Sequence, residues 1–169
     1  MGIHLCLLLY LLINMDMSYR GKFTPTNPTK YVGDIKTIRW LSLWERSVMR
    51  WLDQNKDVVK WGSEIIQIRY ICETDQKSHL YLVDFYIEFK DGRRLMVEVK
   101  PASQTTPPKP DAAKTKTGKT RARYLREAKT YIKNASKWKA AAAFAKKNGL
   151  EFQIWTEHHL RNNLGLKVQ

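Results

Sequence analysis

The chain has 169 residues and a formal net charge of +14 at pH 7. This length fits one domain with an ordinary hydrophobic core, and the positive charge favours a polyanionic partner such as a nucleic acid. The two cysteines, Cys6 and Cys72, are too few for the disulfide framework of a small secreted protein, and we expect no zinc site from the spacing of the cysteines and the four histidines.

The first 17 residues differ in composition from the rest of the chain. Residues 3–13 are mostly apolar, but no Lys or Arg precedes them as in a signal peptide, and the run is shorter than the roughly 20 residues that span a bilayer. Met17 begins a typical protein start, so the segment is either an upstream translation, which we favour, or a docking segment. We expect no membrane insertion, a single domain over residues 18–169, and an extended arm over residues 18–31, which contain two prolines.

A helix is predicted over residues 42–54. Ser42, followed by Glu45 three residues later, forms a capping box. Glu45 also shares the apolar face of the helix with Val48, Met49 and Leu52. A carboxylate on an apolar face is costly without a partner. Glu45 is therefore either a helix cap or a metal ligand, and we favour the metal ligand.

Strands are predicted over residues 64–72 and 79–89, and a further strand leads to Lys100. The loop at residues 90–92 is predicted to have three residues, with Gly92 in the left-handed conformation. This register sets Asp84 opposite Glu98 and pairs the apolar residues with one another, whereas a two-residue loop would move Asp84 to the other face. Because side chains alternate along a strand, Asp84, Glu98 and Lys100 should share one face.

Basic residues dominate the next part of the chain. Residues 101–120 contain four prolines and are predicted as a mobile basic loop that grips DNA, rather than a solvated linker. A helix over residues 121–147, which residues 134–136 can divide, follows. Between Lys109 and Lys147 there are 13 basic residues and two acidic ones. We expect nine of the basic residues to contact phosphates: Lys114, Lys116, Lys119, Arg121, Arg123, Arg126, Lys129, Lys133 and Lys137.

The C-terminal part of the chain is predicted to return to the sheet. Gly149 is a plausible helix C-cap, residues 151–156 form a last strand, and residues 157–164 form a short helix.

The arrangement of Asp84, Glu98 and Lys100 resembles the PD-(D/E)XK nuclease superfamily, whose signature is an acid on one strand and acid-x-Lys on the next. Val83 stands where that signature has proline. The order of the flanking elements is similar to the TnsA-like branch, and from residue 18 onward the chain resembles still more closely the head completion nucleases of T-even-type tailed phages. This resemblance implies an α/β fold with a restriction-endonuclease-like core, in which helices flank a mixed, mostly antiparallel sheet.

The resemblance also implies a DNA endonuclease that uses Mg²⁺, for which Mn²⁺ can substitute. Asp84, Glu98 and the carbonyl of Val99 would bind the ion, and Lys100 would orient the attacking water or stabilise the transition state. Glu45 would complete the ligand set, with Glu64 as a reserve candidate. No small-molecule cofactor is expected.

The expected setting is phage head completion on packaged DNA ends in the host cytoplasm, with virion association and with portal or head-completion proteins as further partners. Two alternatives stay open. One is a DNA-binding structural head or portal protein with little catalysis, in which the acids and the lysine only form a salt-bridged sheet face. The other is a TnsA-like transposition nuclease subunit that needs a partner.

Overall fold

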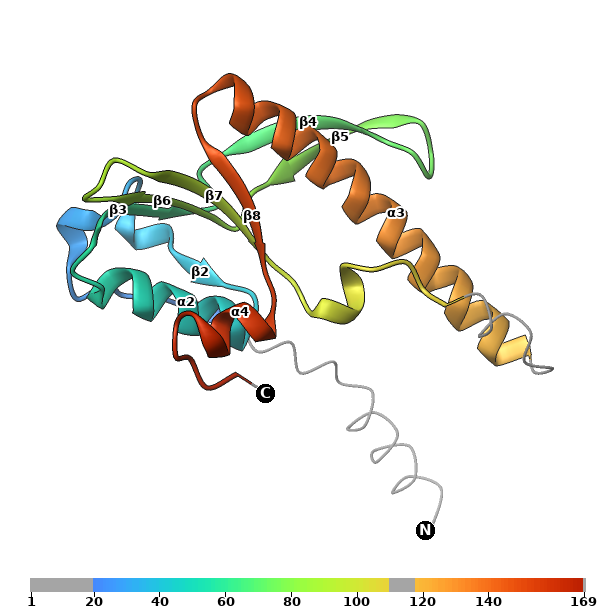
Figure 1. The fold of residues 1–169 in the computed structure, drawn as a ribbon, viewed down its shortest axis with the longest axis horizontal. Helices are drawn as coiled ribbons and strands as arrows, with labels where there is room; N and C mark the ends of the chain where they lie inside the picture. The colour runs from blue at the N-terminus through green and yellow to red at the C-terminus, as the bar shows by residue number, and fades with distance from the viewer. Residues whose placement is uncertain (1–19, 110–117, 169) are drawn as a thin grey trace, which may run out of the picture.

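A computed structural model describes residues 20–109 and 118–168, and for residues 118–120 only the backbone. The central sheet has four strands in the order β3-β6-β7-β8. They are β3 (Val58–Ser63), β6 (Phe85–Phe89), β7 (Arg94–Val99) and β8 (Glu151–Trp155). β6 pairs antiparallel with β3 and β7, and β8 joins β7 in parallel (Figure 1). This confirms the predicted mixed, mostly antiparallel sheet flanked by helices.

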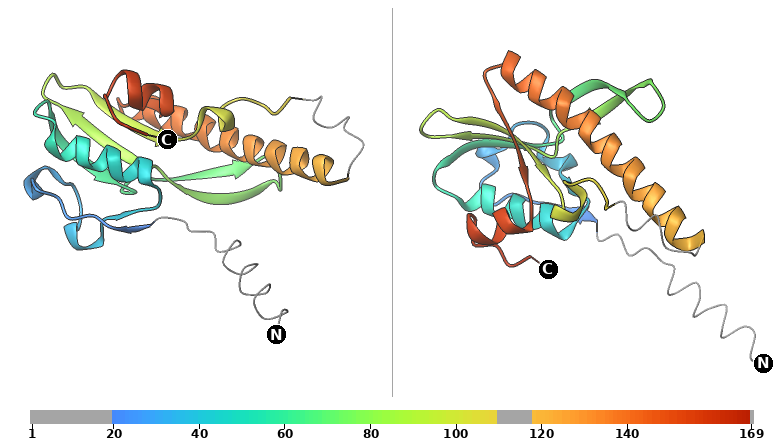
Figure 2. Two further views of the ribbon diagram at one scale, coloured as in Figure 1. Left: turned by 90° about the horizontal axis from the view of Figure 1, so that it is seen from below. Right: turned by 45° about the vertical axis from the view of Figure 1, so that its right-hand side comes forward.

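Helices cover both faces of the sheet. On one face lie α2 (Leu43–Gln54) and α4 (Glu157–Asn162), which are neighbours below the sheet in Figure 1. Their apolar side chains share a core with alternate residues of β6 and β7: Val48, Met49, Leu52, Leu160, Phe85, Ile87, Leu95 and Val97. The other face packs against the C-terminal half of α3 (Gly118–Lys147) through Met96, Ala141 and Ala145. The N-terminal half of α3 projects beyond the sheet (Figures 1 and 2).

The hairpin between β6 and β7 has the predicted register from Phe85 to Phe89, but the predicted pairing of Asp84 with Glu98 does not occur, because the ladder ends at Phe85. Gly92 has a φ of +86°, its N–H donates to the Phe89 carbonyl at 3.0 Å, and Phe85 lies opposite Val97. Leu95, Val97 and Val99 belong to the core beneath α2, so Glu98 points to the face covered by α3.

The predicted strand over residues 79–89 is wrong, because the chain leaves one sheet and enters another at Val83 and Asp84. Residues Lys77–Leu82 form β5, which pairs with β4 (Gln67–Cys72) in a separate two-stranded sheet. The physical reason lies in the hydrogen bonds. The Val83 N–H donates to the Ile66 carbonyl, and the Val99 N–H donates to the side chain of Asp84, so the ladder between β6 and β7 ends at Phe85.

The first predicted strand also begins later than expected, at Gln67, because Glu64 adopts a left-handed φ of +55° and ends the preceding strand β3. β3 itself was not predicted. Gly62 lies in it, and glycine lowers strand propensity. A Cβ at this position would lie 2.5 Å from the Ile65 side chain, so a larger residue would force Ile65 to move.

The predicted extended arm is folded onto the body. β1 (Gly21–Lys22) pairs with β2 (Arg39–Trp40), and two short 3₁₀ helices, η1 (Pro28–Lys30) and η2 (Ile35–Thr37), lie between them. Asp53 of α2, which is 1% exposed, accepts hydrogen bonds from the backbone N–H groups of Thr26 and Asn27. A buried carboxylate satisfied in this way anchors the arm.

The long basic helix is continuous over its whole length. Ser136 does not interrupt it, because its hydroxyl donates to the Ile132 carbonyl one turn earlier. The helix ends before Gly149, whose φ is +64° as expected of a C-cap glycine.

The loop before α3 is shorter than predicted. η3 (Ala102–Gln104) begins two residues after Lys100, and the Ala102 N–H donates to the Glu157 carboxylate at 2.8 Å. α3 begins at Gly118. Residues 110–117, with the predicted DNA contacts Lys114 and Lys116, lie outside the described residues, as do residues 1–17 and the side chain of Lys119. Within the described ranges, no helix has the length and hydropathy that a membrane span requires.

Candidate active site

Glu98 lies at the centre of the candidate site and is held at both carboxylate oxygens. It is 1% exposed, Lys100 Nζ lies 3.0 Å from Oε1, and the hydroxyl of Tyr81 donates to Oε2 at 2.6 Å. Burial and then the charge of Glu98 raise the pKa of Tyr81 far above its usual range, so Tyr81 remains a hydrogen-bond donor. The sheet of β4 and β5 thus contributes directly to the site.

Asp84 lies between β5 and β6, where its Oδ2 accepts the Val99 N–H at 2.7 Å. Burial, followed by the nearby charge of Glu98, raises the pKa of Asp84 well above its ordinary value, although Lys100 and the Val99 N–H act in the opposite direction. The two carboxylates therefore repel each other, and Lys100 only partly offsets that repulsion. A bound cation would offset it further.

Lys100 follows the end of β7, and its side chain is one-quarter exposed. Burial lowers the pKa of Lys100, but the charges of Glu98 and Asp84 outweigh it and raise the pKa overall. Lys100 is therefore a protonated donor at neutral pH rather than a general base.

Glu45 is engaged in the predicted capping box and also lies at the mouth of the site. The Ser42 hydroxyl donates to its Oε1 at 2.9 Å, and the Leu41 N–H donates to its Oε2 at 2.8 Å. Its negative charge contributes to the raised pKa values of Asp84 and Lys100. An open groove of about 420 Å³ is lined by Leu41, Ser42, Leu43, Trp44, Glu45, Val99, Lys100, Pro101 and Gln104.

Glu64, the reserve candidate, lies at the edge of the same site. Its backbone N–H donates to the Asp84 carbonyl at 3.2 Å. Burial, and then the charge of Glu45, raise the pKa of Glu64. Glu45 on helix α2 and Glu64 in the turn after β3 therefore both lie near the pair formed by Asp84 and Glu98.

The predicted DNA contacts on α3 fall into two groups. Arg121, Arg126, Lys129 and Lys133 are exposed, and Arg123 is exposed but paired with Glu127 at 2.7 Å. Lys137 differs, because it is only partly exposed and its Nζ lies 5.1 Å from the centre of the Tyr81 ring. Burial lowers the pKa of Lys137, partly offset by Glu98. Lys137 thus belongs to the active-site region rather than to the outer face of the helix.

Two features of the site were not predicted from the sequence. Tyr81 has no distinguishing signal, because a tyrosine on a strand is usually read as core. The second is a groove of about 600 Å³ next to the site, which shares Leu43 and Trp44 with the groove above. Its basic lining residues are Arg46, Arg50, Arg161 and Lys167.

Comparisons with known proteins agree with this arrangement. The family model described as "TnsA-like endonuclease N terminal" matches residues 55–157, more than half of the chain, and the match includes Asp84, Glu98, Lys100 and Lys137 but not Glu45. The chain is also similar to a protein of Enterobacteria phage T4 named "Head completion nuclease", with 40% identity over 151 residues that cover 89% of this chain and 99% of the relative. The chain therefore belongs to the TnsA-like endonuclease family.

Proposed function

We propose that this protein is a Mg²⁺-dependent DNA endonuclease whose active site consists of Asp84, Glu98 and Lys100, with Glu45 at its mouth. The observation that carries the proposal is that the buried Glu98 and the half-buried Asp84 lie together beside Lys100, with Glu45 adding a further negative charge nearby. Shielding two carboxylates together from water is expensive unless a further positive charge joins them.

The donor atoms fit a hard divalent cation. Asp84 and Glu98 offer carboxylate oxygens, and Mg²⁺ binds through one or two carboxylates while it keeps several waters and takes substrate phosphate oxygens. The carbonyl of Val99, between Glu98 and Lys100 in sequence, is the third proposed ligand. When bound, the ion would acidify a water molecule and offset charge on the scissile phosphate.

The protein's own residues would position the reacting groups. The Val99 N–H fixes the orientation of the Asp84 carboxylate, and the Tyr81 hydroxyl fixes that of Glu98. Lys100, protonated and at the edge of the open groove, would orient the attacking water or donate to the phosphate oxygens as negative charge develops. Lys137 would contact the phosphate from the side of α3.

DNA would lie along α3 and across the groove. The exposed basic residues of α3 lie on a helix that extends beyond the sheet (Figures 1 and 2). The predicted contacts at Lys114, Lys116 and Lys119 would extend this surface. Such contacts to phosphates position DNA without reading its sequence.

The biological setting follows from the similar T4 protein. Because that relative is named a head completion nuclease, we propose that this protein acts on packaged DNA ends in head completion within the host cytoplasm, with portal or head-completion proteins as partners.

The proposal is tested by incubating the purified protein with linear, nicked and supercoiled DNA, with Mg²⁺, with Mn²⁺ or with EDTA. We expect cleavage in both metals and none in EDTA. Glu88→Gln, which changes a carboxylate of β6 outside the proposed ligand set, is a matched control and should cut normally. DNA binding without cleavage in any metal would instead support the alternative of a structural head protein. Cleavage only after a partner protein is added would support the transposition-type subunit.

A further inference from the structure

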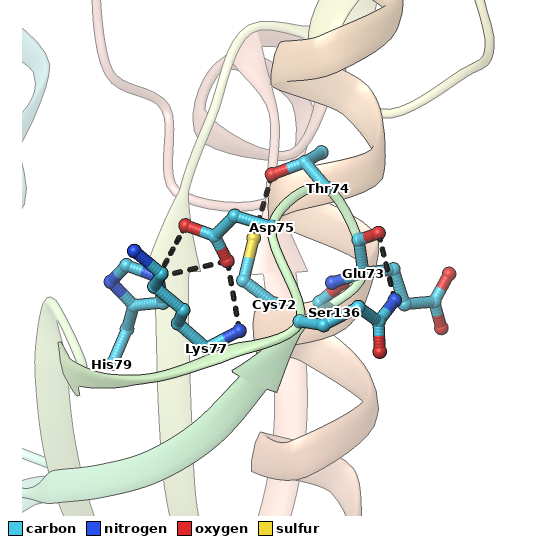
Figure 3. Close-up of polar contacts among 8 residues, drawn as sticks. Cys72, Glu73, Thr74, Asp75, Lys77, His79 and Ser136 are labelled. Carbon is cyan, nitrogen blue, oxygen red and sulfur yellow. Dashed lines mark hydrogen bonds and ion pairs between the residues drawn. The ribbon is translucent and has the colours of Figure 1, made fainter.

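A second cluster of metal-binding side chains lies at the tip of the β4–β5 hairpin. Cys72 ends β4, Asp75 lies in the turn, and His79 belongs to β5. One donor atom from each of these residues lies within 4.8 Å of the other two. Figure 3 shows Cys72, Asp75 and His79 gathered on one side of the turn.

The fold of the hairpin explains why the three residues meet. Tyr70 pairs with His79 and Cys72 pairs with Lys77, so the side chains of Cys72 and His79 point to the same face of the two-stranded sheet. Gln76, with a φ of +55°, closes the turn, and its N–H donates to the Cys72 carbonyl at 2.8 Å. This turn folds Asp75 back over the same face.

We propose that this hairpin binds a Zn²⁺ ion through Cys72 Sγ, a carboxylate oxygen of Asp75 and His79 Nε2, with water as the fourth ligand. Thiolate, imidazole and carboxylate are the ligands that zinc takes in proteins. Hard cations such as Mg²⁺ require oxygen ligands, so this site and the proposed nuclease site should select different metals. The sequence does not indicate the site, because its Cys-x₂-Asp-x₃-His spacing is not that of a zinc motif.

The contacts that zinc would replace are weak ones. His79 Nε2 and a carboxylate oxygen of Asp75 lie within hydrogen-bond distance at 2.9 Å, but the side chains are 37% and 41% exposed, and exposed contacts of this kind contribute little. Among the described residues, the hydrogen-bond partner of the buried Cys72 thiol is the Thr74 hydroxyl, at 3.1 Å. From the bond lengths of zinc, tetrahedral ligand atoms lie roughly 3.3–3.8 Å apart, so shifts of about 1 Å would close the site.

The ion would stabilise a part of the protein on which the nuclease site depends. The Glu73 N–H donates to Ser136 Oγ of α3 at 3.2 Å, so the turn is already attached to the basic helix. The same hairpin carries Tyr81, which binds Glu98. A zinc ion would therefore stiffen the hairpin tip, which the bond from Glu73 to Ser136 already attaches to α3.

The experiment is a titration of the full chain with Co²⁺, followed by the near-ultraviolet thiolate-to-cobalt charge-transfer band. We expect the band in the wild type, its displacement by Zn²⁺, and its loss in Cys72→Ser. His79→Gln, which changes a partly exposed residue and should leave the fold intact, should weaken cobalt binding by more than about 100-fold, since even changes around a ligand cost 10–100-fold. Cys6→Ser and Glu98→Gln are controls that should keep the band.

Three results would overturn the site: no charge-transfer band in the wild type, a band that Cys6→Ser removes, or an unchanged cobalt affinity in His79→Gln. Because the readout needs a thiolate and not DNA cleavage, failure here is distinguishable from failure of the proposed nuclease activity.

Discussion

Glu45 caps helix α2 and also lines the mouth of the groove, where it is a candidate metal ligand. The negative charge of Glu45 is needed for metal binding but not for the cap. In Glu45→Gln the amide can still accept the Leu41 N–H, so the cap is largely kept. We expect Mg²⁺-dependent cleavage to fall by about 10–100-fold, with the melting temperature little changed. The measurement is cleavage across a Mg²⁺ titration, with melting recorded on the same samples.

Ser42→Ala is the matched control for this substitution. It removes the hydroxyl that accepts the Glu45 N–H at 3.2 Å, so it should cost on the order of 1 kcal/mol of stability and leave cleavage intact. A fully active Glu45→Gln protein would assign Glu45 to the cap alone and make Glu64 the next candidate.

Tyr81 is expected to act by holding Glu98 in place. Tyr81→Phe keeps the buried ring and deletes the hydroxyl that donates to Glu98. Loss of such a partner typically costs 10–100-fold in metal affinity or activity, so both the Mg²⁺ requirement and the cleavage rate should change. Tyr86→Phe, which deletes a hydroxyl bound to Glu88 on the central sheet, is the control. Equal cleavage rates for Tyr81→Phe and Tyr86→Phe would show that Tyr81 does not position Glu98 for catalysis.

At the level of residues, the sequence predicted that Asp84, Glu98 and Lys100 lie close together, but not what surrounds them. The orientation of Glu98 and Lys100 could be predicted because a short hairpin fixes register, and a slip by one residue would have set apolar residues against charged ones. Asp84 lies outside the ladder, where its side chain accepts the Val99 N–H. The hydrogen bond from Tyr81 to Glu98 could not be predicted, because it depends on the irregular step at Val83 that separates β5 from the main sheet.

The helix α3 combines two kinds of lysine, which should have separable effects. Lys129 and Lys133 are exposed, so replacing both with Gln should weaken DNA binding and flatten its salt dependence, by roughly 0.9 in the log-log slope for each duplex phosphate that is no longer neutralised. Lys137, beside Tyr81, should instead affect the cleavage rate of bound DNA. Binding as a function of salt and single-turnover cleavage measure the two effects separately. An unchanged slope in the double variant, or a Lys137→Gln variant that loses only affinity, would contradict this division.

At the level of elements, long periodic segments were predicted well and short ones poorly. The residues of α3 recur at helical spacing over many turns, and the predicted division at residues 134–136 does not occur, because Ser136 bonds back to its own helix. The six-residue strand β3 contains Gly62 and has too little pattern to be recognised. β4 and β5 form a two-stranded sheet of their own. They separate from the central sheet next to Asp84, whose side chain accepts the Val99 N–H, and the spacing of apolar residues does not predict such a side-chain hydrogen bond.

For the whole molecule, the active site should reduce stability when no metal is bound. The pKa of Asp84 is raised, mainly by burial, so the folded protein favours the protonated carboxyl. The proton on Asp84 therefore contributes to the free energy of unfolding at low pH, and this contribution is lost as the pH rises through the raised pKa of Asp84. In EDTA, Asp84→Asn should remove this part of the pH dependence and melt higher than the wild type at neutral pH, by about 2–4 °C for each kcal/mol gained.

Mg²⁺ should reverse the order of the two melting temperatures. It should stabilise the wild type by binding the folded state and should have much less effect on Asp84→Asn. Thermal unfolding of both proteins with Mg²⁺ and with EDTA is the check, and a wild type that melts higher than Asp84→Asn in EDTA would be inconsistent with a destabilising Asp84.

The most direct test of the proposed active site is single-turnover cleavage of linear duplex DNA by Glu98→Gln, with DNA affinity measured in parallel without metal. Glutamine keeps an acceptor for the Tyr81 hydroxyl and removes only the charge and a strong metal ligand. We expect a loss of cleavage of at least about 100-fold, with a DNA affinity that is unchanged or higher because a negative charge has gone. Cleavage at the wild-type rate by Glu98→Gln would contradict this expectation.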